Sequence, residues 1–462
     1  MIARNKVEPA TIAIPPQDVS FHPHSFADDA GRLLKWNGRL WRGINAEQAP
    51  FFDGLLRDGT IESLVKRGLL IDTAPSNVNL NGYATVLSHR AIPFISYPNE
   101  WCAAMLKDAA LVILDLAIEL TQRRLTLKDS HPWNVLFDWS QPVYVDLTSI
   151  APQEDLCNWA AYDEFCRFCY YPLLMISNGH HRIARALLPE YQGVLRSEVE
   201  NVIQGNRLSW KAQRLLRRCF NSMRPKFSNR SSQSALTFLE QTRKQLEAVR
   251  LPSFENQHRS RRNESMLQAV DNDRASQPLT VRKILNQLRP STVLDLSRGP
   301  IWTTLVPALM GHNVVSVDSD EARISALYKT AREKNLPILP LIVDFIKPTP
   351  SVGYSNHYSI SAVERLKCDL VLALGLVNRI ASENGLTFDL IAEGLASFAK
   401  RWLVVEFEDR KNKNGIPPDY GRTPGGIQSF INALGARFKN VNIITQSTSG
   451  GTMLLCEKGS DE

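Results

Sequence analysis

The feature that most restricts the fold of this chain is a regular alternation of apolar runs and helical segments from about residue 280 onward. Such alternation predicts an α/β domain with a doubly wound, mostly parallel sheet. The last two runs are joined through Ser and Gly residues typical of turns, which predicts a hairpin added at one edge. The runs expected to form strands are 292–296, 313–317, 338–343, 370–374, 402–407, 441–445 and 453–456.

Three aspartates stand at the ends of the first three predicted strands. Asp295 closes the first, Asp318 closes the second, and Asp344 follows the third. In a doubly wound sheet the ligand binds outside the carboxyl ends of the strands, where the strand order reverses. An acid at the end of the second strand is placed to accept hydrogen bonds from both ribose hydroxyls. An acid after the third can accept one from an adenine amino group, so the pattern indicates a nucleoside-containing cofactor.

The stretch 292–405 resembles class I S-adenosylmethionine-dependent methyltransferases. VLDLSRGPIWTTLVPALMGHNVVSVDSDE is similar to their first motif and the acidic strand end that follows. LPLIVDF is similar to the adenine-side motif, and CDLVLALGLVNRI to the fourth strand, which lines the methyl-transfer site. The resemblance implies a Rossmann-like sheet that binds S-adenosylmethionine. By the same resemblance Asp318 holds the ribose, Asp344 holds the adenine, and Asp295 and Gly299 lie beside the methionine part.

The loop after the first strand departs from that family. The family's loop is glycine-rich, which lets the backbone approach the cofactor, whereas SRGPI here retains only Gly299. We therefore expect glycine at Ser297 and Ile301 to clear side-chain bulk from the methionine side of the site. The catalytic residues of this domain stay unassigned, with Asn378 and Glu406 as the candidates. A degenerate domain of the same fold is the alternative.

A second group of polar residues lies in LKDSHPWNVLFDWSQPVYVDL, a pattern that predicts a loop, a strand, a turn and a strand. Phosphoryl transfer needs a carboxylate near the attacking hydroxyl and oxygen ligands for magnesium. Asp129 would be the catalytic carboxylate, and Asn134 and Asp146 the Mg²⁺ ligands, if a Mg-ATP site is active here. The arrangement resembles the catalytic and metal loops of protein kinases and aminoglycoside phosphotransferases. A glycine-rich nucleotide loop is not apparent, and Arg42 is the one basic residue we place near a phosphate.

These patterns predict four segments. They are a flexible arm at 1–30, a kinase-like α+β domain at 31–225, a basic polar connector at 226–278, and the Rossmann-like methyltransferase domain at 279–460. Within the second segment, Asn37-Gly38 between two short apolar runs predicts a β-hairpin with a type I′ turn. A helix is expected at about 234–249 inside the connector.

Charge and cysteine content restrict the partners and the compartment. The net charge of +7 is uneven, because 207–262 alone carries 14 Lys or Arg against three Glu. This favours a solvated helix face and linker over a nucleic-acid-binding surface. The CxxC of Cys166 and Cys169 favours two buried thiols, with a metal or redox site as the alternative. Unpaired cysteines, the lack of an apolar signal segment and the lack of a membrane-spanning run predict a cytoplasmic protein.

The whole chain resembles a bacterial two-module family of methyltransferases with a kinase-like N-terminal module, whose members include nodulation-associated proteins of rhizobia. SYPNEW, MLKDAAL, LTLKD, WNVLF, PVYVD and YPLL carry this resemblance. It implies a methyltransferase acting on a small-molecule or glycan acceptor, such as a lipo-oligosaccharide. One alternative is an ATP-dependent small-molecule or sugar phosphotransferase with a degenerate methyltransferase domain. The other is a non-catalytic scaffold in which both sites are degenerate.

Overall fold

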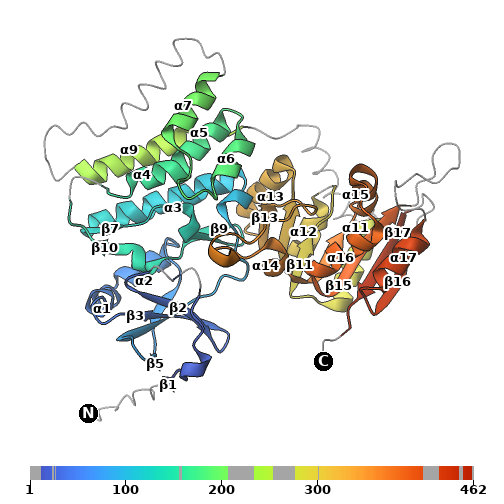
Figure 1. Cartoon of the computed structure of the whole chain (residues 1–462), viewed down its shortest axis with the longest axis horizontal. Coiled ribbons are helices and arrows are strands. Elements are labelled where there is room, and N and C mark those ends of the chain that lie inside the picture. Colours follow the sequence, from blue (N-terminus) through green and yellow to red (C-terminus); the bar gives the residue numbers. More distant parts are fainter. Residues whose placement is uncertain are drawn as a thin grey trace. The chain divides into compact units, whose positions relative to one another are not determined.

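The computed structural model describes residues 12–22, 25, 28–155, 159–205, 234–252, 276–299, 301–408, 426–446 and 451–459. The chain divides into two compact units (Figure 1). Unit 1 comprises Met1–Asn99, Met105–Asp138 and Pro142–Pro252, and unit 2 comprises Glu100–Ala104, Trp139–Gln141 and Ser253–Glu462. Half of the predicted arm and most of the predicted connector lie outside the described residues. The predicted segment boundaries stay predictions.

Unit 1 begins with a four-stranded antiparallel sheet in the order β2-β3-β6-β4. Asn37 and Gly38 join β2 to β3 with φ of 49° and 70°, which confirms the predicted hairpin, because a type I′ turn needs positive φ at both positions. One face of the sheet packs on Ile14, Val78 and Leu80. The elements are β1 (Ile12–Ala13), β2 (Gly31–Trp36), β3 (Arg39–Ile44), α1 (Ala49–Arg57), α2 (Thr60–Lys66), β4 (Thr73–Pro75), β5 (Val78–Asn79) and β6 (Thr85–His89).

The rest of unit 1 is mainly helical, with the antiparallel strand pair β7–β10 and the strand pair β8–β9. The first two residues of α3 and the first residue of β9 belong to unit 2. The helix predicted inside the connector is present as α9. An ion pair and two hydrogen bonds join it to α3. Arg243 of α9 pairs with Asp115 at 2.5 Å, and Lys107 Nζ donates to the carbonyls of Glu247 and Val249. The elements are α3 (Ala103–Gln122), β7 (Leu125–Leu127), β8 (Val135–Asp138), β9 (Gln141–Tyr144), β10 (Ile150–Pro152), α4 (Tyr162–Phe165), η6 (Cys166–Tyr170), α5 (Tyr171–Ser177), α6 (His181–Leu187), α7 (Arg196–Gly205) and α9 (Ser234–Ala248).

The CxxC lies in η6, a π-helical turn. Both thiols are buried and free. Burial raises the pKa of Cys166 to about 12 and that of Cys169 well above its usual value, so both thiols are protonated at neutral pH. Among the described residues, no group of three or more His, Cys, Asp or Glu side chains is placed to hold a metal ion.

Unit 2 contains a seven-stranded sheet in the order β13-β12-β11-β14-β15-β17-β16. The first five strands are parallel, and β17 and β16 form an antiparallel hairpin beyond β15. This confirms the doubly wound sheet and the added hairpin. The sheet strands are β11 (Thr292–Asp295), β12 (Asn313–Asp318), β13 (Ile338–Ile342), β14 (Cys368–Ala373), β15 (Ala399–Glu408), β16 (Asn440–Gln446) and β17 (Gly451–Glu457).

The central strands of this sheet are buried almost without interruption, β12 and β14 included. Since neighbouring side chains on a strand point to opposite faces, continuous burial means that both faces are covered. The helices of unit 2 are α11 (Ser276–Leu288), α12 (Trp302–Leu309), α13 (Glu321–Lys334), α14 (Ala362–Arg365), α15 (Val377–Asn384), α16 (Phe388–Phe398) and α17 (Ile427–Gly435).

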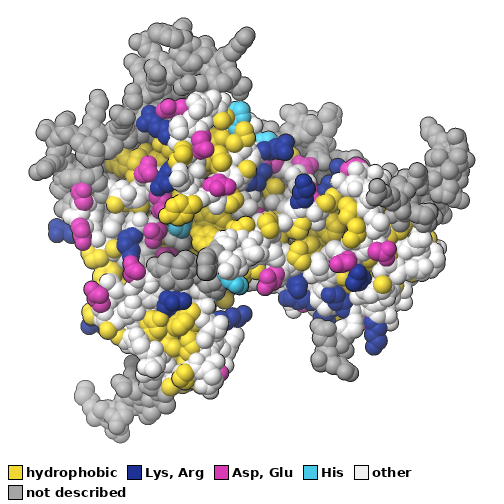
Figure 2. Space-filling model, viewed as in Figure 1, with side chains coloured by type: hydrophobic (Ala, Val, Ile, Leu, Met, Phe, Trp, Pro, Cys, Tyr) yellow, Lys and Arg dark blue, Asp and Glu magenta, His cyan; other side chains and the backbone are white. Residues whose placement is uncertain are grey.

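The surface carries both signs of charge. On the face shown in Figure 2, basic and acidic side chains of the described residues are scattered among each other. Most of the basic segment 207–262 lies outside the described residues. Within the described ranges, every helix is too short or too polar to span a lipid bilayer.

Candidate functional site

The strand order reverses between β11 and β14, and this is where a doubly wound sheet binds its ligand. The loop after β11 is held along the end of β14. Arg298 N donates to Leu374 O at 3.0 Å, and Leu374 N donates to Ser297 Oγ at 3.0 Å. Gly375 has a φ of +66°, and a Cβ there would come within 2.9 Å of the Arg298 carbonyl oxygen. Ser297 and Arg298, the first two residues of the loop that the sequence assigns to the cofactor, are therefore fastened to the end of β14.

The residues of this loop differ in their exposure to solvent. Gly299 is exposed, and a Cβ added to it would meet no atom within 4 Å. Ser297 is only 1% exposed, because its hydroxyl turns inward to accept from Leu374 N. Ile301 is also buried. The burial of both side chains, and the bond of the Ser297 hydroxyl to Leu374 N, argue against the expectation that glycine at Ser297 and Ile301 would clear bulk from the site, which stays a prediction.

We expect Ser297→Gly to weaken the loop instead. The change leaves Leu374 N without its buried acceptor, at a cost of about 1–3 kcal/mol in the free energy of unfolding. Urea denaturation checks this, with Ser297→Ala as the matched control. The alanine variant also loses the hydroxyl but keeps the backbone restricted, so it should be destabilised slightly less. Tighter S-adenosylmethionine binding by the glycine variant would contradict this view of the loop.

Asp295 lies at the centre of a buried polar network and is itself fully buried. Its Oδ1 accepts from Ser297 N at 2.9 Å, and its Oδ2 accepts from Thr303 Oγ1 at 2.8 Å and from Thr304 Oγ1. Arg323 Nη2 donates to the same Oδ2 at 3.0 Å. Both carboxylate oxygens are thus already engaged within unit 2, and a direct contact of Asp295 with a cofactor stays a prediction.

The other two strand-end acids each have one oxygen engaged by a loop. Asp318 Oδ1 accepts from Asp320 N at 3.0 Å, and Asp344 Oδ1 accepts from Ile346 N at 2.7 Å. Asp318 is 8% exposed, and its Oδ2 lies 3.6 Å from Arg323 Nη1. Burial raises the pKa of Asp318, while the charge of Arg323 opposes that rise. Among the described residues, Oδ2 of Asp318 has only this ion pair with Arg323, and Oδ2 of Asp344 accepts no hydrogen bond.

The two catalytic candidates differ in how their side chains are used. Asn378, in α15, donates from Nδ2 to Glu408 O at 2.6 Å and accepts on Oδ1 from Glu408 N at 2.8 Å. Its amide thus fastens the end of β15. Glu406 accepts from Gln277 Nε2 at 2.5 Å, and the backbone N–H of Gly375 opposes the rise in the pKa of this carboxyl group. Gly375 follows the end of β14, where the strand order reverses, so Glu406 fits a role near the reaction better than Asn378 does.

Burial, and to a smaller extent the negative charge of Glu408, raises the pKa of Glu406 above its usual value. A carboxyl with a higher pKa in the folded state than in the unfolded chain destabilises the fold as pH rises past its unfolded pKa. We therefore expect Glu406→Gln, which can keep the bond from Gln277, to raise the free energy of unfolding at neutral pH by about 0.5–2 kcal/mol. The gain should vanish near pH 3, below the unfolded pKa. Chemical denaturation at both pH values checks this, and an unchanged or lower stability at neutral pH would contradict it.

Sequence reasoning missed Arg323, which joins the acids of two strands. One signal was present in the sequence. Arg323 stands in the first turn of α13, where the helix dipole disfavours a positive charge. A cation in that position indicates that a nearby anion holds it.

In unit 1 the hydroxyl of the buried Tyr144 joins two of the three predicted residues, Asp129 and Asn134. That hydroxyl donates to Asp129 O at 2.8 Å and accepts from Asn134 Nδ2 at 3.2 Å. Burial, followed by the charge of Asp146, raises the pKa of Tyr144. Burial also raises the pKa of Asp129, with further contributions from Glu164 and Asp146. The structure therefore places the Asp129 carbonyl and the Asn134 amide on one hydroxyl, within reach of the charge of Asp146, and a shared metal site stays a prediction.

Arg42, on β3, also belongs to this group. Its side chain is only 6% exposed and forms ion pairs with Asp28 at 2.5 Å and with Asp146 at 3.3 Å. Thr148 Oγ1 accepts from Arg42 Nη1 at 2.6 Å and donates to Asp146 Oδ1 at 2.7 Å. The arginine that the sequence placed near a phosphate thus lies beside the predicted metal ligand Asp146.

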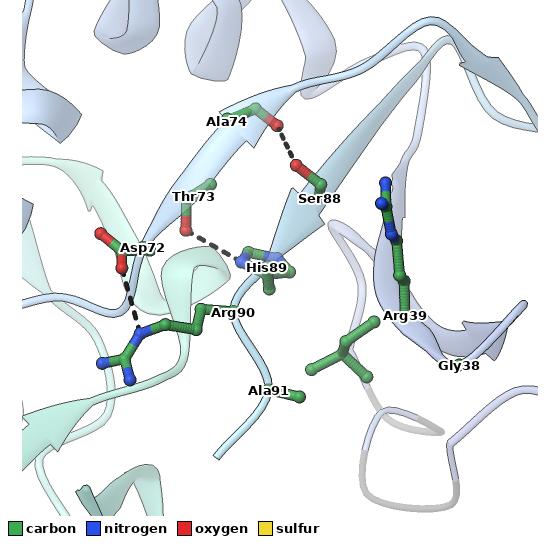
Figure 3. Close-up of a pocket in the computed structure, with 10 residues that line it drawn as sticks. Gly38, Arg39, Asp72, Thr73, Ala74, Ser88, His89, Arg90 and Ala91 are labelled. Atoms are coloured by element: carbon green, nitrogen blue, oxygen red, sulfur yellow. Dashed lines mark hydrogen bonds and ion pairs between the residues drawn. The ribbon is translucent and has the colours of Figure 1, made fainter. Parts of the chain in front are cut away.

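A separate pocket of about 450 Å³ lies in unit 1 where β3, β4 and β6 come together (Figure 3). Its polar groups largely pair with each other. His89 Nδ1 lies 2.8 Å from Thr73 Oγ1, and Arg90 forms an ion pair with Asp72 at 3.0 Å. Burial, followed by the charge of Arg42, lowers the pKa of His89 to about 3, so its ring is neutral. None of the predicted site residues lines this pocket.

Comparison with curated proteins gives a relative of nearly the same extent. No protein-family model matches the chain. Nodulation protein NoeA of Rhizobium meliloti (strain 1021) is 24% identical over 456 residues, covering 90% of this chain and 92% of NoeA.

Solved structures match at lower similarity. TehB from Haemophilus influenzae is 15% identical with a TM-score of 0.28, over 39% of this chain and 61% of TehB, less than two thirds of its length. Magnesium protoporphyrin IX methyltransferase (ChlM) from Synechocystis PCC 6803, with bound SAM, is 16% identical with a TM-score of 0.27, over 42% of this chain and 79% of that one. Similarity at this level carries no argument about what the chain does.

Proposed function

We propose that the chain is an S-adenosylmethionine-dependent methyltransferase that binds its cofactor at the carboxyl edge of the unit 2 sheet. The observation that carries this proposal is the position of Asp318. Asp318 ends β12, the second strand along the chain in a sheet whose parallel strands lie in the order β13-β12-β11-β14-β15. Among the described residues, its Oδ2 has only the ion pair with Arg323. A carboxylate in that place is suited to a ribose.

The residues around Asp318 fit the remaining parts of such a cofactor. Asp344 has one oxygen available for an adenine amino group, since Oδ1 alone is engaged by its loop. Gly299 is exposed and lets backbone come close to a ligand. When bound, the cofactor supplies an electrophilic methyl group. Glu406, whose pKa is raised by burial, is our candidate for the group that takes a proton from the acceptor.

For the acceptor we propose a small molecule or a glycan, such as a lipo-oligosaccharide. The support is the similarity to nodulation protein NoeA along nearly the whole of both chains. This part of the proposal is independent of the cofactor site, and the cofactor can be tested without the acceptor.

A second candidate function, phosphotransfer from Mg-ATP in unit 1, is favoured by one specific observation. The Asp129 carbonyl and the Asn134 amide both bond to the Tyr144 hydroxyl, the charge of Asp146 acts on that hydroxyl, and the buried Arg42 pairs with Asp146. Asp129 would take the proton of the attacking hydroxyl, and Asn134 and Asp146 would supply oxygen ligands to Mg²⁺. The kinase-like interpretation of unit 1 rests on this grouping.

Calorimetric titration of one full-length preparation with S-adenosylmethionine and with Mg-ATP tests both candidates. Binding of S-adenosylmethionine supports the methyltransferase. Binding of Mg-ATP alone would favour the phosphotransferase with a degenerate methyltransferase domain. Binding of neither would favour the non-catalytic scaffold.

A further inference from the structure

A buried arginine connects the two acids that end the first and second strands of unit 2. Arg323 is the third residue of α13, whose N-cap Asp320 accepts from Ala322 N and Arg323 N. The Arg323 side chain is only 3% exposed. A cation buried in the first turn of a helix is unfavourable both for its desolvation and for the helix dipole. Strong compensating contacts are therefore needed.

Those contacts come from two neighbouring strands. Nη2 donates to Asp295 Oδ2 at 3.0 Å, at the end of β11. Nη1 donates to Ser316 Oγ at 3.3 Å and lies 3.6 Å from Asp318 Oδ2, at the end of β12. The planar guanidinium can face two acids at once because its donors leave in fixed, diverging directions. A lysine ammonium carries the same charge but cannot reproduce this fork.

The two acids receive different support from Arg323. Asp295 has three further donors, in Ser297, Thr303 and Thr304, and both its oxygens are engaged. Asp318 accepts one hydrogen bond from a backbone N–H group. Its charged form is otherwise favoured by the positive charge of Arg323 and, to a smaller extent, by that of Arg298. Burial and the negative charge of Asp320 disfavour the charged form. Arg323 thus matters more to the charge and placement of Asp318 than to those of Asp295.

We propose that Arg323 is a positioning residue of the cofactor site: it is anchored on Asp295 and holds the Asp318 carboxylate charged and in place to bind the ribose. This inference rests on the proposed cofactor function. It assigns to Arg323 no contact with the cofactor itself. Its effect on binding must therefore pass through Asp318.

A double-mutant cycle on the full chain tests that dependence, with the dissociation constant of S-adenosylmethionine as the readout. Arg323→Gln should weaken binding by about tenfold when Asp318 is present and by less than about twofold in the Asp318→Asn background. Arg323→Lys should recover part of the loss. Lys334→Gln, which removes an exposed positive charge from the other end of α13, is the control for net charge and should bind like the wild type.

Since Arg323→Gln leaves Asp295 without its counter-charge, that variant can fail to fold. The pair Asp295→Asn and Asp295→Asn/Arg323→Gln covers this case, because the double variant removes one buried charge of each sign. The double variant should bind S-adenosylmethionine about tenfold more weakly than Asp295→Asn alone.

The outcomes separate the two proposals. A wild-type chain that does not bind S-adenosylmethionine overturns the proposed function, and this inference with it. A wild type that binds, together with an Arg323→Gln variant of equal affinity, overturns the inference alone. An equal loss from Arg323→Gln with and without the Asp318→Asn substitution also overturns it, because the arginine would then act on the fold and not through Asp318.

Discussion

Asp318→Ala is expected to weaken S-adenosylmethionine binding by roughly tenfold to a hundredfold. Hydrogen bonds to a charged acceptor contribute about 1.5–3 kcal/mol, and each factor of ten corresponds to about 1.4 kcal/mol. The Asp318 side chain is well placed to supply them, because Oδ1 is engaged by Asp320 N while Oδ2 meets only the arginine among the described residues. Calorimetry on the wild type and the variant measures the change.

The matched control is Asp320→Asn. Asp320 is two residues away and caps α13 through its side chain, and asparagine preserves that cap. The control should lose less than about threefold in affinity, which corresponds to about 0.7 kcal/mol and is well below the loss expected at Asp318. If Asp318→Ala binds as well as the wild type, the cofactor does not lie at the end of β12.

The largest loss of stability is expected from Asp295→Ala. The change removes the acceptor of four donors and leaves the Arg323 guanidinium buried beside fewer anions. Breaking a buried ion pair from one side typically costs about 3–5 kcal/mol. Because the chain has two units, hydrogen exchange of the β11 and β12 amides during urea unfolding is the suitable measurement.

Asp369→Ala is the control for this second prediction. Asp369 accepts from the backbone N–H groups of Ser291 and Thr292 at the other end of β11, near the surface. Its loss should cost only about 1 kcal/mol. Equal costs at Asp295 and Asp369 would mean that the buried network contributes no more than an ordinary surface hydrogen bond.

The sheet of unit 2 was predictable from sequence because strand and helix periods alternate and strand-end acids mark its carboxyl edge. The hairpin of unit 1 was predictable because Asn37-Gly38 suits one type of turn. These signals are local. Each depends on residues within a few positions of one another, so no tertiary structure is needed to interpret them.

The direction of individual side chains was not predictable. Ser297 turns inward to a donor at the end of β14, and Asn378 uses its amide on β15, 30 residues away. Both partners come from strands that only the folded sheet brings close. The same applies to the packing of α9, a helix predicted inside a polar connector: Arg243 of α9 pairs with Asp115 on α3, 128 residues away.

The most direct measurement is a crystal structure of the full chain with S-adenosylhomocysteine, which differs from the cofactor only by the methyl group. Our account predicts that both ribose hydroxyls lie within hydrogen-bond distance of Asp318, with the adenine amino group at Asp344 and the loop at Gly299 beside the amino-acid part. A ligand bound elsewhere, or bound at this edge with its ribose away from Asp318, would contradict it.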